Sequence, residues 1–167
     1  MMEDYYKIPE FKVNFKSNIS LPSYEDFYNL NEEKNILEKY KTYENFKEFE
    51  NKLFDEYSDI CDEYMESLKN YTKLLGHPEV IQNPMEEECE AVTRGFNMGG
   101  IESYPKQYQK EIKSASKDWI LLFQMDTVET DDYELMFGDS GHIYFWIKKE
   151  DLANKNFENI WLILQCY

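Results

Sequence analysis

WILLFQMDTV, residues 119–128, is the stretch that decides the fold, because a nearly continuous apolar run is typical of a strand in the middle of a sheet. Two further apolar runs follow it, HIYFWI at 142–147 and IWLILQCY at 160–167. A glycine-containing turn at 138–141 separates the first run from the second. We therefore expect a mostly antiparallel sheet in the C-terminal part of the chain.

A long amphipathic helix is expected upstream of the sheet, over residues 43–70, with Thr42 as its N-cap. Its face opposite the apolar side is rich in Asp and Glu. We expect the apolar side to pack on the sheet, which gives an α+β fold. The apolar side chains recur at spacings of three and four and form one stripe, made of Phe46, Phe49, Leu53, Tyr57, Ile60, Tyr64 and Leu68.

The N-terminal region carries weaker patterns. Phe11, Val13 and Phe15 alternate with polar residues, which is the period of a half-buried strand. Ser23 is suited to cap a short helical turn, and Asn31 is suited to cap a second helix. These patterns predict one strand and two helical segments before the long helix.

The chain is expected to form a single α+β domain. Its 167 residues suit one hydrophobic core, so we assign residues 11–167 to one domain and residues 1–10 to a flexible tail. Residues 85–92 are predicted to start a helix or an irregular lid, and residues 103–115 to form a short helix. Aromatic residues make up 17% of the sequence, so Tyr and Phe should fill much of the core.

The chain is strongly acidic. It has 34 acidic and 18 basic residues, a formal net charge of -16 at pH 7. A field of that sign repels phosphate, so we expect no direct binding to nucleic acid or to anionic membranes. The same field speeds encounter with a basic partner and keeps a protein soluble. A solvated surface without a partner is the alternative interpretation of this charge.

The three cysteines, Cys61, Cys89 and Cys166, form no CxxC pair, so the sequence supports neither a disulfide framework nor a zinc site. We expect free thiols, no metal and no cofactor. The sequence shows no signal peptide and no apolar run that approaches the length of a membrane span. A cytoplasmic location follows from these patterns, and the oligomeric state is left open.

Four segments of the chain resemble the YwqG-like family of bacterial proteins, whose activity is not settled. They are LLGHPEVIQ at 74–82, DWILLFQMDTV at 118–128, FGDSGHIYFWIKKEDLANKNFENIW at 137–161 and LILQCY at 162–167. Their order and spacing agree with the family over residues 74–167. The resemblance implies that the first portion of the family is missing here. Some family members lie near toxin genes, which makes an immunity role a hypothesis.

Polar residues at one rim of the expected sheet form a candidate ligand-binding site. Strict alternation along a strand places Phe123 and Met125 on the same face as Trp119 and Leu121, and the polar side chains of the strand on the other face. If the polar residues converge, they suit a small polar ligand, a cation or general acid–base work. The alternative, which we favour, is that they satisfy neighbouring strands and turns. The candidates are Gln82, Gln124, Asp126, Asp139 and Gln165.

Acidic side chains are the candidate contacts to a basic partner. The acidic runs do not follow the EF-hand pattern, so a dedicated cation site is not predicted. His77 and His142 stand in no arrangement typical of nucleophilic catalysis, and P-loop, GxGxxG and HExxH motifs are absent from the sequence. We therefore predict no catalytic residue, and catalysis is left open. The candidate contacts are Asp55, Asp59, Asp62, Glu63, Glu66, Glu86, Glu87, Asp131 and Asp132.

Three functions fit these patterns. The first, which we favour, is an acidic interaction domain. In this hypothesis an immunity-type or phage/defence-related inhibitor, a mimic of nucleic-acid charge, binds a basic protein that acts on nucleic acid. The second is a module that binds a small polar ligand or a cation at the Gln/Asp patch, with or without catalysis. The third is a half-domain that completes a larger assembly.

Overall fold

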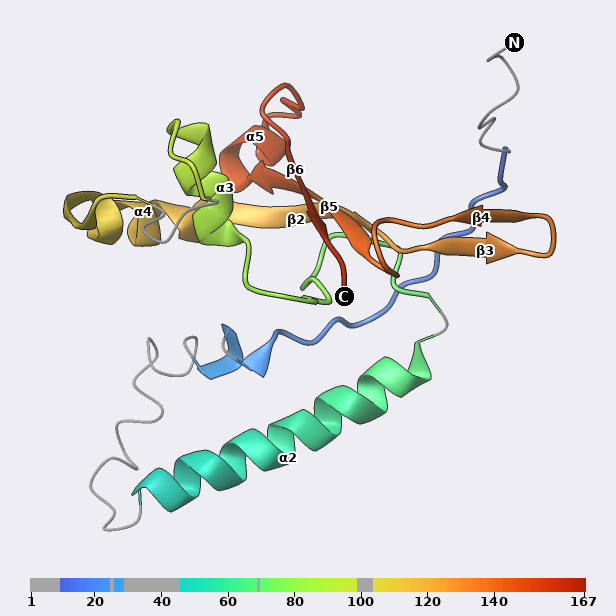
Figure 1. Ribbon diagram of the computed structural model, residues 1–167, viewed down its shortest axis with the longest axis horizontal. Coiled ribbons are helices and arrows are strands. Elements are labelled where there is room, and N and C mark those ends of the chain that lie inside the picture. The colour runs from blue at the N-terminus through green and yellow to red at the C-terminus, as the bar shows by residue number, and fades with distance from the viewer. Residues whose placement is uncertain (1–9, 25, 29–45, 69, 99–103) are drawn as a thin grey trace.

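The computed structural model shows an α+β fold with an antiparallel main sheet. The sheet has four strands in the order β1-β2-β5-β6, and each neighbouring pair is antiparallel (Figure 1). The three apolar runs of the sequence form β2, β5 and β6, as predicted. The strands span Lys73–Leu74, Trp119–Met125, His142–Lys148 and Trp161–Gln165. The structure describes residues 10–24, 26–28, 46–68, 70–98 and 104–167.

Strand β2 contains an irregularity that the sequence pattern did not reveal. Its register to β5 shifts between Leu121 and Phe123, which leaves Leu122 as an extra residue. Leu121 and Gln124 pair with β5 residues two positions apart, so they share a face. Phe123 and Met125 lie on the opposite face, and the prediction that they share a face with Leu121 is wrong.

The core lies on the face of the sheet that carries Leu121. Met85 and Cys89 are fully buried there, at the start and in the middle of helix α3, Glu86–Thr93. Residues 85–92 were predicted to start a helix or an irregular lid, and the structure shows the helix. The strands contribute a cluster of large side chains to this core, made of Trp119, Leu121, Tyr144, Trp146 and Ile163.

Short elements join the long strands. Two 3₁₀ turns and a helix, η2, α4 and η3, follow one another directly before β2, and helix α5 follows β5. Strands β3 and β4 form a separate antiparallel hairpin that projects beyond the main sheet (Figure 1). These elements span Lys106–Tyr108, Gln109–Ala115, Ser116–Asp118, Lys149–Ala153, Val128–Thr130 and Tyr133–Leu135.

The opposite face of the main sheet is apolar and partly open. Phe123 of β2 and Phe145 of β5 lie in its centre with ring centroids 5.8 Å apart, and both are half-buried. Leu74, Leu162 and Leu164 lie towards its two edges and are exposed. The residues of the four strands on this face include no charged side chain.

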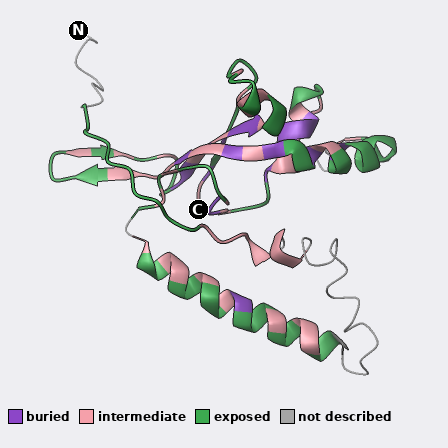
Figure 2. Cartoon of the chain, turned by 180° about the vertical axis from the view of Figure 1, so that it is seen from behind, coloured by how far each residue is buried: buried purple, intermediate pink, exposed green. Residues whose placement is uncertain are grey.

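The predicted long helix forms α2, Phe46–Ser67, and its predicted start at 43–45 lies outside the described residues. Tyr57 is the one buried side chain among the described residues of α2 (Figure 2). Its hydroxyl donates to the carbonyl of Pro22 at 2.8 Å. The helix packs on this N-terminal segment and on the loop 78–80, which lie between it and the sheet (Figure 1). The predicted packing of the sheet with the long helix is therefore made through this segment and this loop.

Residues 10–23 form an extended segment without a ladder partner in the described chain. The strand predicted from Phe11, Val13 and Phe15 is therefore wrong. The alternation is present, but a strand also needs a neighbour to receive its backbone hydrogen bonds.

Ser23 caps a short helical turn, as predicted. Its Oγ accepts a hydrogen bond from the backbone N–H of Asp26 at 3.1 Å, and its carbonyl accepts from Phe27 at 2.9 Å. The turn places Phe27 against Tyr57 of α2, with stacked rings 4.2 Å apart. The helix predicted after Asn31 and most of the predicted tail lie outside the described residues.

Candidate functional site

Gln165, at the end of β6, holds a loop over the core face of the sheet. Its Oε1 accepts hydrogen bonds from the backbone N–H groups of Ile81 and Gln82, both at 3.1 Å. Its Nε2 donates to the carbonyl of Asn83 at 2.7 Å. The side chain is buried, and it satisfies three backbone groups that make no ladder bond. One amide thus fixes the end of the loop.

Gln124 of β2 holds the beginning of the same loop. Its Oε1 accepts from the backbone N–H of Glu79 at 3.0 Å, and its Nε2 donates to the carbonyl of Tyr71 at 2.9 Å. The side chain is fully buried. Donor and acceptor are both occupied by backbone, which is the structural role favoured from the sequence for these amides.

A buried histidine lies at the start of β5. His142 Nε2 is 3.1 Å from Asp126 Oδ1, and its Nδ1 is 3.2 Å from the hydroxyl of Tyr144. Tyr144 gives its one hydrogen to the carbonyl of Glu79 at 2.6 Å, so its oxygen is left to accept. Both ring nitrogens of His142 therefore lie within hydrogen-bond distance of an oxygen atom. Asp126 also accepts from the backbone N–H of Tyr71 at 3.2 Å.

Glu79 is a buried carboxylate that the sequence analysis did not single out. Lys73 of β1 forms an ion pair with its Oε2, and Tyr64 of α2 donates to its Oε1 at 3.4 Å. Burial lowers the pKa of Lys73, and the bond to Glu79 opposes that shift. Glu79 therefore joins α2 to the sheet. The feature of the sequence that could have indicated Glu79 is an isolated acidic residue between Pro78 and Val80.

The other two predicted ligand-binding residues are exposed near the end of β6. Gln82 donates from Nε2 to the carbonyl of Cys166 at 2.7 Å, and the carbonyl of Asp139 accepts from the backbone N–H of Tyr167 at 3.1 Å. The structure thus brings Gln124 and Gln165 to one loop and leaves Asp139 at the surface. A ligand-binding role for the five residues stays a prediction.

The predicted partner-binding acids lie in three places. Asp131 and Asp132 are exposed at the turn between β3 and β4. Glu86 and Glu87 are half-buried at the start of α3, where Glu87 accepts from the hydroxyl of Tyr104 at 2.8 Å. The remaining five are all exposed on α2, and four of them repeat at spacings of four and three along one face. They are Asp55, Asp59, Asp62, Glu63 and Glu66.

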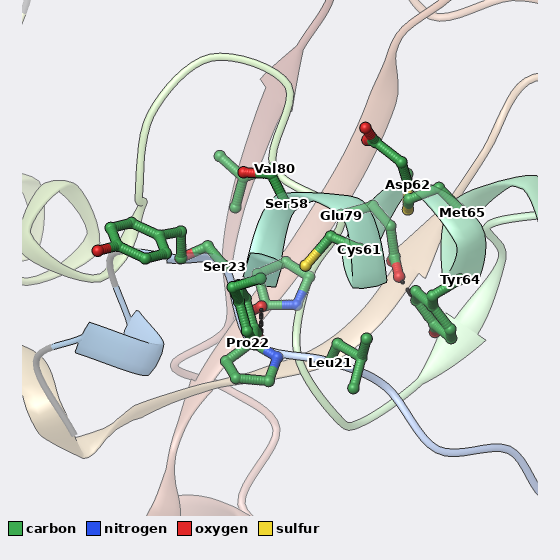
Figure 3. A pocket seen from close by; sticks show the side chains of 13 residues that line it. Leu21, Pro22, Ser23, Ser58, Cys61, Asp62, Tyr64, Met65, Glu79 and Val80 are labelled. Atoms are coloured by element: carbon green, nitrogen blue, oxygen red, sulfur yellow. Dashed lines mark hydrogen bonds between the residues drawn. The ribbon is translucent and has the colours of Figure 1, made fainter. Parts of the chain in front are cut away.

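A cavity of about 240 Å³ lies between α2 and the N-terminal segment (Figure 3). Its wall is mostly aromatic and aliphatic, and its lining residues include the acids Asp62 and Glu79 but no Lys or Arg. Figure 3 shows Tyr64 and Glu79 meeting at one end of it. Burial raises the pKa of Tyr57 and of Tyr64 to about 12, so both hydroxyls stay protonated at neutral pH. Sequence reasoning missed this cavity because it joins segments far apart in the chain.

The described part of the chain offers few groups for covalent or metal chemistry. No three His, Cys, Asp or Glu side chains gather there to hold a metal ion. All three cysteines are free, and burial raises the pKa of the Cys61 and Cys89 thiols, which disfavours the nucleophilic thiolate. None of the helices in the described ranges is long and apolar enough to cross a membrane.

Comparison with known proteins identifies a family and leaves the activity open. No curated protein and no solved structure matches the chain. A family model described as a domain of unknown function, DUF1963, matches residues 2–166. The match extends well upstream of residues 74–167, on which the resemblance in the sequence rested. The chain therefore belongs to the DUF1963 family of domains of unknown function.

Proposed function

We propose that the protein is an interaction module that binds a basic protein partner through the acidic face of α2. The observation that carries the proposal is the charge of this helix. Its residues 46–67 include eight acidic and two basic side chains. One of the two lysines, Lys52, is already within 3.6 Å of Glu56. Within α2 itself, acidic side chains therefore outnumber basic ones by four to one.

A concentrated acidic face on an exposed helix suits a basic partner for a kinetic and an energetic reason. Its field steers an oppositely charged protein and raises the rate of association. Exposed carboxylates are fully hydrated in the free protein. The free protein therefore carries no desolvation cost for them.

The cavity beside the acidic face offers an anchor for the same partner. Asp62 belongs both to the acidic face and to the cavity lining. The tyrosines of the wall, Tyr24, Tyr57 and Tyr64, suit an apolar or cationic side chain, since aromatic faces attract both. A partner that places an Arg or a Leu there would gain specificity in addition to charge.

The narrower form of the proposal is an immunity-type or phage/defence-related inhibitor. The basic partner would then be a protein that acts on nucleic acid, because such proteins carry positive surfaces that an acidic helix can imitate and cover. The finer resemblance to YwqG-like proteins, some of which lie near toxin genes, supports this form. A cytoplasmic location belongs to the same proposal.

The second candidate, a site for a small polar ligand or cation at the Gln/Asp patch, has less support. Gln124 and Gln165 already spend their amide groups on backbone. A ligand would have to displace the loop that they hold. We therefore place this candidate behind the interaction function.

Two variants, in each of which five acidic side chains are replaced by neutral amides, test the proposal. The first changes five acids of α2 to amides: Asp55→Asn, Asp59→Asn, Asp62→Asn, Glu63→Gln and Glu66→Gln. The matched control changes five exposed acids of the hairpin and the turn that follows it: Glu129→Gln, Asp131→Asn, Asp132→Asn, Glu134→Gln and Asp139→Asn. Each immobilised protein is exposed to lysate of the source organism at low and at high salt, and bound proteins are identified by mass spectrometry.

Wild type and the hairpin control should retain a basic protein at low salt and release it at high salt, whereas the α2 variant should retain much less. Equal retention by the two variants, or retention of no basic protein by wild type, would overturn the proposal. If the hairpin variant alone lost the basic partner, the binding surface would be assigned to the hairpin and not to α2.

A further inference from the structure

Strand β6 is an open edge of the main sheet in the part of the chain that the structure describes. It pairs with β5 alone among the described strands, so its outward N–H and C=O groups have no ladder partner there. Its sequence, Trp161–Gln165, contains neither a charge nor a proline, and Leu162 and Leu164 are 49% and 47% exposed. Sheets usually protect an edge with charges, prolines or bulges. This edge is therefore competent to accept another strand.

Residues 11–16, FKVNFK, have the character of a strand that lacks a sheet. The segment is extended, and no backbone hydrogen bond joins it to another part of the described chain. Phe11, Val13 and Phe15 are 43%, 68% and 77% exposed. Alternating side chains and free backbone groups are the properties of a segment that binds by strand addition.

The segment is held away from the β6 edge of its own molecule. Its end is fixed beside β1, where Ser20 Oγ accepts from the backbone N–H of His77 at 2.8 Å. Its beginning contacts the hairpin, where the rings of Phe11 and Tyr133 are 5.9 Å apart. Since β1 and β6 are opposite edges of the sheet, these two contacts lie away from the β6 edge of the same molecule.

The charges of the two surfaces are complementary. Lys12 and Lys16 are the charged side chains of residues 11–19, in a chain whose net charge is -16. Exposed acids flank β6, with Glu158 before it and Asp139 beside its end. A strand rises about 3.3 Å per residue, so the two lysines stand about 13 Å apart, close to the length of a five-residue strand.

We propose that residues 11–16 of one copy of this chain add as a strand to the β6 edge of a second copy. Phe11, Val13 and Phe15 then extend the open apolar face formed by Leu162 and Leu164. Donor and acceptor are different surfaces, so the contact is heterologous and a dimer is its smallest product.

Two single proline variants, Val13→Pro and Asn14→Pro, test strand addition. Successive N–H groups of a strand point to opposite sides, so only one of the two prolines removes a bond to the acceptor edge. Neither N–H makes a hydrogen bond in the described structure, so both variants should unfold at the wild-type temperature. Light scattering coupled to gel filtration measures the mass of each protein over a wide range of concentration.

Wild type should increase in mass with concentration. One proline variant should associate about tenfold more weakly than the other, because only one of them removes a backbone hydrogen bond to the acceptor edge. A wild type that stays monomeric, or two proline variants that respond equally, would overturn the proposal. Leu162→Lys on the acceptor edge gives an independent check, because lysine blocks edge pairing without touching the donor. Association unchanged by Leu162→Lys would also overturn it.

Discussion

The two parts of the molecule are stabilised by different means. From Tyr71 onwards, a buried apolar cluster and two buried amides join the strands, α3 and the loop between β1 and α3. Among the described residues before Tyr71, Tyr57 is the one buried side chain. Hydrogen bonds of tyrosine hydroxyls and contacts between aromatic rings hold α2 in place. The comparison teaches that the sheet part is the scaffold, whereas α2 is a separable surface that can change its charge without loss of the core.

The largest expected effect is in the sheet part, at the turn before β5. A Cβ added to Gly141 would lie 2.3 Å from the carbonyl oxygen of Phe137 and 2.4 Å from that of Gln165. We predict that Gly141→Ala lowers the free energy of unfolding by about 3 kcal/mol, because backbone atoms on both sides must shift. Gly95→Ala is the control: open space surrounds it, and only its φ of +88° opposes a side chain, so about 1 kcal/mol is expected. Urea unfolding measures both values.

The second-largest loss of stability is expected when the side-chain amide of Gln165 is removed. Gln165→Leu removes three hydrogen bonds to the part-buried backbone groups of Ile81, Gln82 and Asn83, so we predict a loss of about 2–3 kcal/mol. Gln82→Ala removes one exposed bond in the same loop and should cost less than about 1 kcal/mol. Urea unfolding followed by tryptophan fluorescence suits this comparison, because all three tryptophans lie on β2, β5 and β6. Equal losses of stability in Gln165→Leu and Gln82→Ala would show that Gln165 does not hold the loop in place.

Glu90 provides a pH test of the scaffold. This buried carboxylate of α3 accepts bonds from Trp119 Nε1 and Lys148 Nζ, both at 2.9 Å, and from Arg94 Nε at 2.6 Å. Burial acts to raise its pKa, but the bonds from Lys148, Trp119 and Arg94 outweigh burial and hold the pKa below its ordinary 4.5.

A lowered pKa stabilises the fold above about pH 4.5, and that contribution is lost as the pH falls through the folded pKa. We predict that Glu90→Gln costs about 2 kcal/mol at neutral pH. The difference from wild type should shrink when unfolding is measured at progressively lower pH below 4.5. A difference that stays constant with pH would contradict this assignment.

The smallest effect is expected where α2 is attached. Tyr57→Phe removes the 2.8 Å bond to the Pro22 carbonyl and should cost about 1 kcal/mol. Tyr64→Phe removes a bond of 3.4 Å and should cost less. Helical circular dichroism during urea unfolding is the measurement, because α2 is the longest helix of the described residues. A loss of several kcal/mol in either variant would mean that α2 is an integral part of the core.

The strands were predictable from the sequence because their patterns are local. Continuous apolar runs predicted β2, β5 and β6, and Ser23 predicted its own helical turn. The bulge at Leu122 was not predictable, because one residue in an all-apolar run leaves no mark on the pattern. The missing strand at Phe11–Phe15 has a related cause: alternation shows what a segment is able to do, and pairing depends on a distant edge.

The site was only partly predictable. Gln124 was identified from the alternation along its strand, and Gln165 from its match to a polar position of the family that the chain resembles. The partners could not be named, since Gln124 bonds Glu79, 45 residues away, and Gln165 bonds Gln82, 83 residues away. The cavity beside α2 was missed for the same reason, because it forms only when three separate segments meet.

Hydrogen exchange of individual backbone amides tests the division into scaffold and separable helix most directly. We predict that central amides of β2 and β5 exchange only through global unfolding, whereas amides of α2 exchange through a smaller opening, at least about tenfold faster. Equal protection in α2 and in β5 would contradict the account, because the helix and the sheet would then open as one unit.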